Sequence, residues 1–449
     1  MLKYLTPLLV LCLLIGCDEK KKELNEAVTV IFSCDTQGRL EPCGCFSGQY
    51  GGLSRFHTKI SGFNKGLILK VDAGDAISGK EDYDLILYKY VQTAFKKMGY
   101  HALNAGAREA SLSISQLRSI DLKKGPPIIS ANLYDKSTAK PVFEQSITVE
   151  ENGLKILITG IVDPDVMGEQ LGEGLEVKNM QTSISEVLKG SDADMKILLA
   201  FCTPDKMKEL AGQFYEFNLI LGGKTPQPSQ KLIKENRSFI LYTTNEAKNI
   251  GYVQGVLTNK GLDKVDYEIP ILTERVKENK EILQLAVDYR KEIRNSKLDA
   301  DTVDSNTEEL IPGVKPQASY VGSATCSACH PTSHQQWQHS AHAKAFSALK
   351  KRDSDADPKC IKCHTVGFGE PSGYLRAFKE QRLINVGCES CHGPGSEHVR
   401  QRSSGEKALF KYRPLGEGDC RKCHYGEFSR PFNWDLMWPM IKHGKEVKK

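Results

Sequence analysis

The chain has 449 residues, of which 40% are hydrophobic and 26% are charged, and this composition is typical of a soluble globular protein with two or three domains. Its net charge at pH 7 is only +5. No cluster of lysines and arginines alternates with aromatic residues, so nothing in the sequence indicates binding to nucleic acid.

The first residues, MLKYLTPLLVLCLLIGC, contain one lysine and then an apolar run that is too short to cross a bilayer. The run ends in Leu-Ile-Gly-Cys, which resembles the lipobox of bacterial lipoproteins; the alternative is an ordinary signal peptide with a chance cysteine. The resemblance implies that residues 1–17 form a signal, with cleavage before Cys17 and a lipid on its thiol, and that residues 18–26 form a polar tether. We therefore expect an exported lipoprotein, anchored on the periplasmic or outer face of a bacterial membrane.

Residues 27–272 alternate apolar stretches with helical patterns. Several stretches are almost continuously apolar, which is typical of strands buried on both faces. Between two of them, residues 82–100 place apolar side chains on one helical face. The pattern predicts a layered α/β domain with strands in AVTVIFSCD, GLILKVDAGD, LKILITGIVDP, MKILLAFC, FNLILGG and SFILYTT.

Two further segments follow this domain. Residues 273–318 combine a charged helix, which carries one apolar stripe, with an acidic linker that contains proline. In residues 319–449 cysteine and histidine become frequent and apolar runs become scarce. Because this part lacks the side chains for an ordinary core, we expect a mostly helical and irregular domain whose interior is filled by another group.

The C-terminal part repeats the motif Cys-x-x-Cys-His four times. In c-type cytochromes the two thiols form thioethers with the haem and the histidine binds its iron. Zinc is the alternative, but a zinc site made of Cys-x-x-Cys pairs does not require a histidine after every pair. Haem attachment outside the cytoplasm also agrees with the predicted export. The motifs predict four covalently attached haem c groups, held by Cys326, Cys329 and His330, by Cys360, Cys363 and His364, by Cys388, Cys391 and His392, and by Cys420, Cys423 and His424.

The apolar faces of four porphyrins would supply the missing core. From residue 320 onward the chain has 21 lysines and arginines against 13 aspartates and glutamates. We expect this excess to offset the haem propionates, and a docking patch for an acidic redox partner is the alternative. The aromatic residues expected to pack on the haems are Trp337, Phe346, Phe368, Phe378, Trp434 and Trp438.

Four haems have eight axial positions, and the motif histidines fill four of them. The spacing of the remaining histidines does not show which of them bind iron. These are His334, His339, His342, His398 and His443.

The stretches YVGSATCSACH, WQHSAHAKAF, CIKCHTVGFG, VGCESCHGPGSEH and CRKCH resemble the tetrahaem cytochrome c-554 family across residues 319–444. The resemblance implies that His342, His398 and His443 are distal iron ligands and that one haem lacks a distal histidine. His334 or His339 could close that position. Saturated irons favour an electron carrier that works with a redox partner protein or a quinone-linked donor, whereas an open iron also permits a redox enzyme acting on a small ligand.

The first domain resembles the 5′-nucleotidase-like metallophosphoesterases over about residues 27–260, through FSCDTQGRL, GGLSRFHTKI, ILKVDAGDAISG, MGYHALNAGAREA and NLILGGKTP. The resemblance implies a four-layer α/β/β/α fold. The family holds two metal ions with Asp, His and Asn side chains, and here only Asp35 and Asp75 match ligand positions. We therefore expect no phosphoesterase activity; metal-dependent nucleotide hydrolysis is the alternative. The positions that depart from the family pattern are Gln37, Ala107, Arg108, Lys224 and Pro226.

Four cysteines lie outside the haem motifs and the signal, namely Cys34, Cys43, Cys45 and Cys202. If the fold resemblance holds, they gather at the rim of the former metal site. One hypothesis is that a thiol site has replaced it, either binding an additional, soft metal ion or cycling as a dithiol. Structural disulfides, such as one between Cys34 and Cys202, are the alternative. The first domain would then serve the haems as a redox or binding module.

Overall fold

A computed structural model describes residues 24–42, 49–167, 170–244, 246–296, 298, 318–376, 381–405, 414–425 and 432–443. The predicted lipid anchor at Cys17 lies outside these residues. Among the residues described, none of the helices combines the length and the apolar character needed to span a bilayer.

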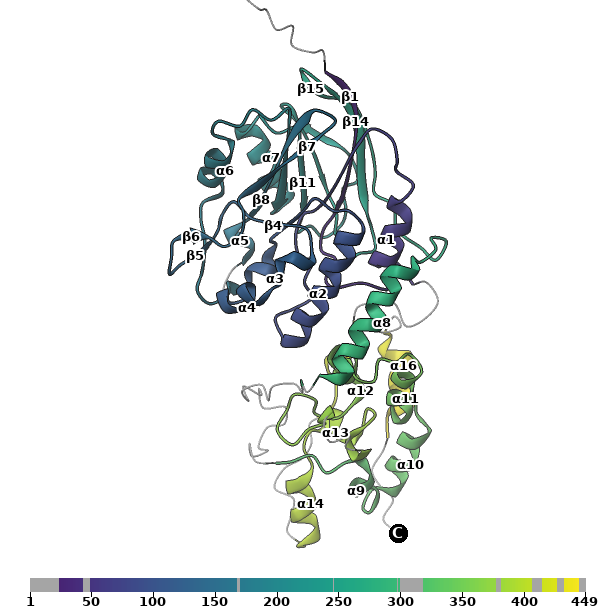
Figure 1. Ribbon diagram of the computed structural model, residues 1–449. Coiled ribbons are helices and arrows are strands. Elements are labelled where there is room, and N and C mark those ends of the chain that lie inside the picture. Colours follow the sequence, from purple (N-terminus) through teal and green to yellow (C-terminus); the bar gives the residue numbers. More distant parts are fainter. Residues whose placement is uncertain are drawn as a thin grey trace, which may run out of the picture.

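Two six-stranded sheets form the centre of the first domain (Figure 1). In each sheet four adjacent strands run parallel, and antiparallel strands complete the edges. The first sheet has the order β15 (Gly261–Glu268), β14 (Gly251–Thr258), β1 (Asn25–Ser33), β2 (Leu67–Asp72), β3 (Ala102–Asn104) and β4 (Ile128–Ile129). The second has the order β12 (Ile233–Glu235), β13 (Ser238–Tyr242), β11 (Leu219–Gly223), β10 (Met195–Phe201), β8 (Leu154–Val162) and β7 (Ser146–Glu151).

The alternation of side chains along the strands explains why the sheets are apolar on both faces. In β10, Ile197 and Leu199 belong to a buried cluster shared by the two sheets, whereas Leu198 and Ala200 face a second cluster on the outer side. That outer cluster is covered by α6 (Met180–Leu188) and α7 (Pro204–Gln213). The other outer face is covered by α1 (Leu53–Ile60) and α2 (Asp82–Lys97). The four-layer α/β/β/α prediction is therefore confirmed.

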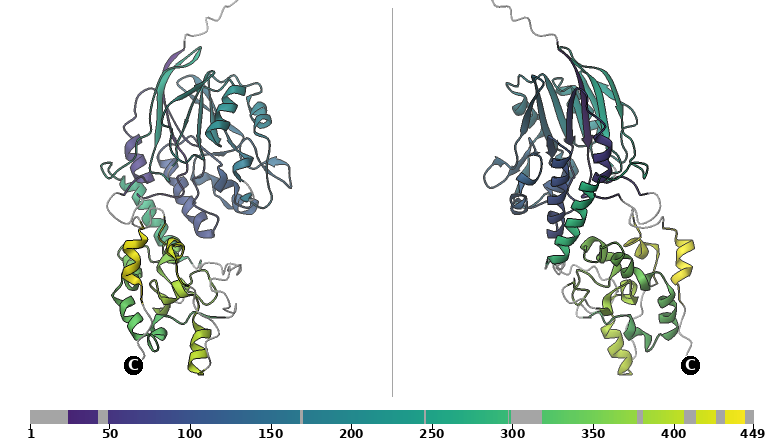
Figure 2. Two further views of the ribbon diagram at one scale, coloured as in Figure 1. Left: turned by 180° about the vertical axis from the view of Figure 1, so that it is seen from behind. Right: turned by 45° about the vertical axis from the view of Figure 1, so that its right-hand side comes forward.

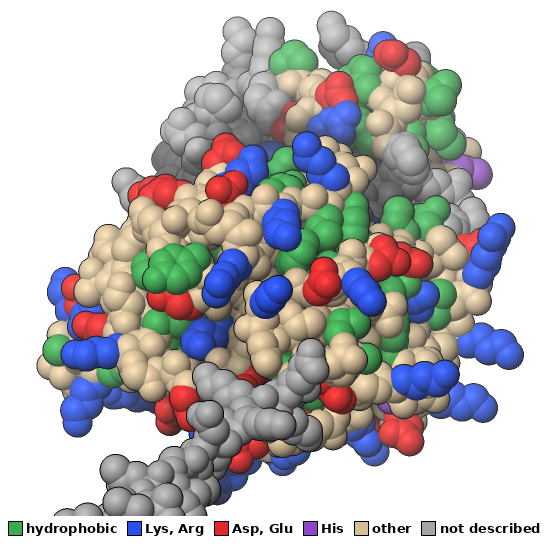
Figure 3. All heavy atoms as spheres, turned by 90° about the horizontal axis from the view of Figure 1, so that it is seen from above, with side chains coloured by type: hydrophobic (Ala, Val, Ile, Leu, Met, Phe, Trp, Pro, Cys, Tyr) green, Lys and Arg blue, Asp and Glu red, His purple; other side chains and the backbone are tan. Residues whose placement is uncertain are grey.

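Shorter elements connect these layers. They are α3 (Ala107–Ala110), α4 (Ile114–Ser119), the 3-10 turn η1 (Leu122–Lys124), α5 (Pro164–Met167), and a small sheet of β5 (Leu133–Asp135), β6 (Lys140–Pro141) and β9 (Leu175–Val177). On the face seen from above, lysines and arginines alternate with aspartates and glutamates around small apolar groups (Figure 3). That face therefore carries no field of a single sign.

The charged helix predicted after residue 272 is α8 (Lys280–Asn295), and it belongs to the first domain. Its apolar stripe is buried in the cluster that also holds α1 and α2. The first domain therefore extends beyond the predicted domain boundary at residue 272. The charged outer face of α8 does not indicate in the sequence how deeply the opposite face packs. The buried stripe consists of Ile282, Leu285, Ala286, Tyr289 and Ile293.

The described C-terminal region is built of short helices and irregular chain, as predicted. Its one sizeable apolar cluster has only seven buried side chains, and α10, α15 and α16 bury none. The helices are α9 (Ser323–Ser327), α10 (Pro331–His339), α11 (Ala345–Lys350), α12 (Pro358–His364), α13 (Cys388–His392), α14 (Ser396–Ser403), α15 (Glu417–Arg421) and α16 (Trp434–Ile441), with 3-10 turns η3 (His342–Lys344) and η5 (Gln381–Leu383).

The two domains meet where α8 reaches the C-terminal helices, as Figures 1 and 2 show from three directions. Arg294 at the end of α8 pairs with Asp353 at 2.5 Å and with Asp355 at 2.7 Å. Arg376 donates to the Ile293 carbonyl oxygen at 3.0 Å. Both contacts join the first domain to the C-terminal region.

Candidate haem sites and the cavity of the first domain

Each Cys-x-x-Cys-His motif lies on or directly after a short helix. The amide of His330 donates to the Cys326 carbonyl at 2.9 Å, and the amide of His424 donates to the Cys420 carbonyl at 2.8 Å. One helical turn therefore brings both thiols and the histidine of a motif to the same side of the chain, the arrangement that a covalently attached haem requires.

Three of the four motif histidines face a second histidine. The ring centroids of His330 and His398 are 6.2 Å apart. Those of His424 and His342 are 6.0 Å apart, and those of His392 and His443 are 5.8 Å apart. Two imidazoles bound to one metal through bonds of about 2 Å each have centroids about 6 Å apart, so each pair fits the two axial positions of one iron.

His364 of the second motif is the exception. Its Nδ1 lies 2.8 Å from the Ala345 carbonyl oxygen, which fixes the tautomer and leaves Nε2 for a metal. Within the described residues its ring faces no second imidazole at a comparable distance. The ring of His334 instead packs against Trp337, with centroids 5.2 Å apart, and exposed His339 places Nδ1 2.8 Å from the Gln335 carbonyl.

Hydrogen bonds hold the three facing histidines in place. The Trp337 indole donates to the Val386 carbonyl at 2.8 Å, and the Val386 amide donates back to the His342 carbonyl at 3.2 Å. Gln336 donates to the Lys442 carbonyl at 2.7 Å, next to His443. At the start of α14, the Ser396 amide donates to the Ser319 carbonyl, and the Ser319 amide donates to the Ser396 hydroxyl at 2.8 Å.

The motifs also approach one another. The thiol of Cys326 lies next to that of Cys388, and the thiol of Cys363 lies next to that of Cys423. Motif one therefore adjoins motif three, and motif two adjoins motif four. A zinc site needs four ligands. In the described part of the chain, not even three His, Cys, Asp or Glu side chains come together closely enough to hold a metal ion. The arrangement fits haem better than zinc.

The aromatic residues predicted to contact haem differ in their surroundings, because some lie on an exposed helix and others in the small core. Trp434 and Trp438 stack at 4.7 Å on α16, a helix that exposes 73% of Leu436 and 71% of Met440. This apolar surface suits packing against a large planar group. Phe346 belongs to the small core with Phe368 at its edge, and Phe378 lies outside the described residues.

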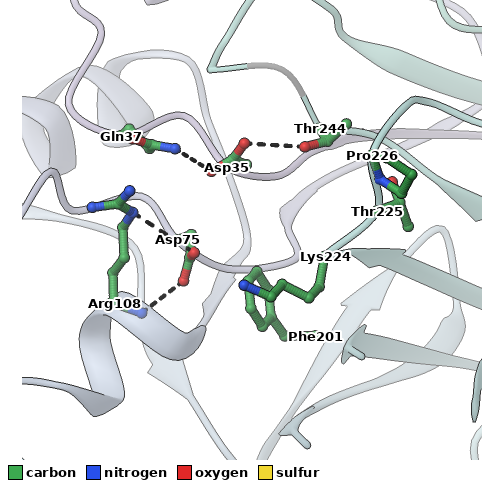
Figure 4. A pocket seen from close by; sticks show the side chains of 9 residues that line it. All are labelled: Asp35, Gln37, Asp75, Arg108, Phe201, Lys224, Thr225, Pro226 and Thr244. Atoms are coloured by element: carbon green, nitrogen blue, oxygen red, sulfur yellow. Dashed lines mark hydrogen bonds and ion pairs between the residues drawn. The ribbon is translucent and has the colours of Figure 1, made fainter. Parts of the chain in front are cut away.

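A cavity of about 380 Å³ opens in the first domain at the carboxyl ends of the parallel strands of both sheets (Figure 4). Asp35 follows β1, Asp75 follows β2, and Lys224 follows β11. Parallel strands place their following loops at one edge, which is why residues distant in sequence meet there. The cavity is lined by Asp35, Gln37, Asp75, Arg108, Phe201, Lys224, Thr225, Pro226 and Thr244.

The two carboxylates of the cavity already have partners. Asp35 accepts from Gln37 Nε2 at 2.6 Å and from the Thr244 hydroxyl at 3.0 Å. Asp75 accepts from the Arg108 amide at 2.7 Å, and its Oδ2 lies 3.8 Å from Arg108 Nε. Burial, followed by the charge of Glu109, raises the pKa of Asp75 to about 8.

The backbone at this cavity is unusual. Asp35, Gln37, Asp75 and Lys224 have φ of 57°, 45°, 59° and 62°. Residues other than glycine rarely adopt this left-handed backbone conformation, and residues that do so cluster at functional sites. The loops therefore retain a demanding geometry although the metal-ligand set is incomplete.

For Cys34 and Cys202, the structure contradicts the proposed gathering of thiols at this site. Cys34 is buried, with its thiol 3.3 Å from the Gly74 carbonyl oxygen, and burial followed by Asp72 raises its pKa well above the usual value. Cys202 lies in the outer cluster under α7, where burial followed by Asp163 raises its pKa. Both are free thiols that belong to different clusters, and neither lines the cavity. Cys43 and Cys45 lie outside the described residues.

The reason lies in the packing around Cys34. It directly precedes Asp35, whose left-handed backbone, with φ of 57°, turns the chain after the end of β1. Asp35 lines the cavity, whereas Cys34 packs into the core. A Cβ atom on Gly223 would lie 2.0 Å from Cys34 Sγ, so the glycine makes room for the buried thiol.

Comparison with known proteins matches the two parts of the chain to different proteins. The family model for cytochrome c554 and c-prime matches residues 325–393, which include the first three motifs. The cytochrome c-554 of Nitrosomonas europaea is 36% identical over 110 residues, covering 20% of this chain and 47% of that protein. The C-terminal region is thus similar to cytochrome c-554 and implies covalently bound haem c.

The first domain is similar to nucleotidases. The 5′-nucleotidase of Vibrio cholerae is 27% identical over 169 residues, covering 35% of this chain and 30% of that protein. The structure of a 5′-nucleotidase precursor from Thermus thermophilus matches with a TM-score of 0.52 and 18% identity, covering 60% of this chain and 59% of that one. The chain therefore spans at most about half the length of the two curated relatives, and the structural match establishes the fold alone.

Several important residues could not be recognised from the sequence. Phe201, Thr225 and Thr244 line the cavity because strands β10, β11 and β13 end there. Asp84 and Lys359 join the two domains at 2.9 Å. The only sequence signal for Lys359 was its place directly before the second motif.

Proposed function

We propose that this protein is an exported, lipid-anchored c-type cytochrome that carries four haems and transfers electrons to or from a redox partner. The observation that carries the proposal is the pairing of three motif histidines with His398, His342 and His443 at 5.8–6.2 Å. A bound haem c iron exchanges one electron reversibly.

The chain's own residues would set the properties of these sites. The three histidine pairs would saturate three irons and hold them in fixed surroundings, which suits a carrier. His364 would bind the fourth iron from one side, with its ring oriented by the Ala345 carbonyl at 2.8 Å. A small ligand could then reach the opposite side, so a redox enzyme acting at the second motif is the second candidate function.

Close approach of the motifs supports electron exchange within the domain. The approach of Cys326 to Cys388 and of Cys363 to Cys423 would bring haems held by these motifs next to one another. The excess of lysines and arginines from residue 320 onward suits docking of an acidic redox protein, with a quinone-linked donor as another source of electrons.

The first domain would be a binding module and not a phosphoesterase. Two metal ions need more ligands than Asp35 and Asp75 supply, and both carboxylates are already engaged by Gln37, Thr244 and Arg108.

The proposal is tested by expressing the full chain with its signal in a bacterium that attaches haem c. Mass spectrometry of the purified protein should show four covalent haems and a lipid on Cys17. A Cys17→Ser variant should keep its haems and appear in the soluble extract. A protein without covalent haem would contradict the cytochrome assignment, and a Cys17→Ser variant that stays on the membrane would contradict the lipid anchor alone.

A further inference from the structure

The helix that carries the second haem motif, α12, is held against the first domain near its beginning. Lys359, in the first turn of α12, pairs with Asp84 of α2 at 2.9 Å. Arg376 joins the chain just before α12 to the end of α8, because its NH1 donates to the Ala356 carbonyl at 2.9 Å and to the Ile293 carbonyl at 3.0 Å. Figure 1 shows the end of α8 beside α12. The first domain therefore forms part of the surroundings of the second motif.

Tyr289 on α8 places a buried donor at this junction. The residue is only 4% exposed, and its ring packs against that of Tyr90 on α2 with centroids 6.1 Å apart. Burial, followed by the charges of Asp357, Asp84 and Cys360, raises the pKa of its hydroxyl, which therefore stays protonated. Within the described residues this buried hydroxyl has no hydrogen-bond partner. A buried donor without an acceptor costs free energy, so it indicates a missing group.

The acidic side chains near Tyr289 are engaged elsewhere. Asp84 accepts from the Ser78 hydroxyl at 2.7 Å and pairs with Lys359 through the same oxygen. Asp357 caps the start of α12 by accepting from the Lys359 amide at 3.0 Å. A haem attached to the second motif would bring two propionates, and carboxylates are strong acceptors. The unpartnered hydroxyl of Tyr289 fits a site that such a group completes.

We propose that Tyr289 of the first domain is a positioning residue for the haem held at Cys360 and Cys363, and that its hydroxyl donates a hydrogen bond to a propionate of this haem. The inference rests on the proposed function, because it requires haem at the second motif. A donor at the propionate weakens the negative field of this carboxylate at the iron, which favours the ferrous state. Tyr289 thereby raises the reduction potential of this haem, and the first domain influences electron transfer without being a redox centre itself.

The test uses the full, haem-loaded protein and measures the potential of the CO-reactive haem by spectroelectrochemical titration. Tyr289→Phe removes only the hydroxyl. At a fixed applied potential, the ratio of ferrous to ferric iron at this haem should fall about threefold, which equals a fall of roughly 30 mV because tenfold corresponds to 59 mV for one electron. Tyr90→Phe is the matched control. Its hydroxyl donates to Glu292 at 2.5 Å, so its removal should leave the potential unchanged.

A second measurement separates the hydrogen bond from simple packing. If the propionate accepts from Tyr289, Tyr289→Phe should lower the urea midpoint of the haem-loaded protein, because a carboxylate loses its donor. If the hydroxyl has no partner even with haem bound, its removal should leave the midpoint unchanged or raise it. Tyr289→Met, which fills the space with a flexible apolar side chain, is a second variant if Tyr289→Phe does not fold, and it should show the same fall in potential.

The outcomes separate the two proposals. Absence of covalent haem would refute the proposed function, whatever Tyr289 contributes to packing. With haem present, an unchanged potential in Tyr289→Phe would refute the inference, as would an equal fall in Tyr90→Phe. A urea midpoint that stays the same or rises in Tyr289→Phe would overturn the hydrogen bond to the propionate.

Discussion

Lys359 Nζ lies 2.9 Å from Asp84 Oδ1, and this ion pair joins the residue before the second haem motif to the first turn of α2. Asp84 also accepts from the Ser78 hydroxyl at 2.7 Å and from the Glu81 amide at 3.2 Å. One buried carboxylate thus takes part in capping the N-terminus of α2 and also binds the second domain to this helix.

This pair should contribute measurably to stability. In a double-mutant cycle of Asp84→Asn and Lys359→Met, we expect a coupling free energy of about 1–3 kcal/mol, since the two groups touch and one is buried. Denaturant unfolding followed by circular dichroism would measure it. The exposed pair Lys155 and Asp192 serves as the control and should give less than about 0.5 kcal/mol. A coupling near zero for Asp84 and Lys359 would contradict their role at the domain interface.

Removing a histidine that faces a motif histidine should leave one further iron without its second axial ligand. In His342→Ala the fraction of haem that responds to CO should rise from about one quarter to about one half, because the iron of His424 loses its second ligand. His339→Ala is the control and should leave the fraction unchanged, since its Nδ1 is engaged with the Gln335 carbonyl at 2.8 Å. An increase in His339→Ala instead would show that the ligands are assigned wrongly.

The left-handed backbone at Lys224 should cost stability. Lys224→Gly is expected to raise the free energy of unfolding by about 1 kcal/mol, because glycine adopts a φ of 62° without strain. Ala139→Gly, at a φ of 54° on an exposed turn, should give a similar gain. A destabilised Lys224→Gly variant would show that the lysine side chain is held by interactions that outweigh the strain.

Stability should also depend on pH through Asp72. Burial raises the pKa of this fully buried carboxyl well above its usual value. The folded protein therefore keeps a proton that the unfolded chain releases above about pH 4, so wild-type stability falls as pH rises through that range toward the folded pKa. Asp72→Asn does not titrate, and its melting temperature relative to the original protein should increase from pH 5 to pH 8. A difference that stays constant with pH would contradict the raised pKa.

Much of the fold followed from residue patterns. Continuous apolar stretches such as MKILLAFC predicted doubly buried strands, and β10 buries side chains on both faces. The scarcity of apolar runs after residue 319 likewise predicted a region with a small core. These properties are local, so the sequence alone reveals them.

Other features depend on contacts between distant residues. Nothing near His342 in the sequence indicates that it faces His424 and not His364. Cys34 adjoins Asp35 in sequence, yet packing turns its thiol away from the cavity. The ion pair between Asp84 and Lys359 forms only when α2 and α12 meet.

The most direct test of this account is the visible spectrum of the dithionite-reduced protein before and after addition of CO. The account predicts a spectrum of covalent haem c in which CO shifts the absorption of about one quarter of the haem. Replacement of Cys360 and Cys363 should abolish this CO-induced shift. A reduced protein without a haem spectrum would contradict the central claim. A CO shift that survives the loss of the second motif would contradict the assignment of the open iron to His364.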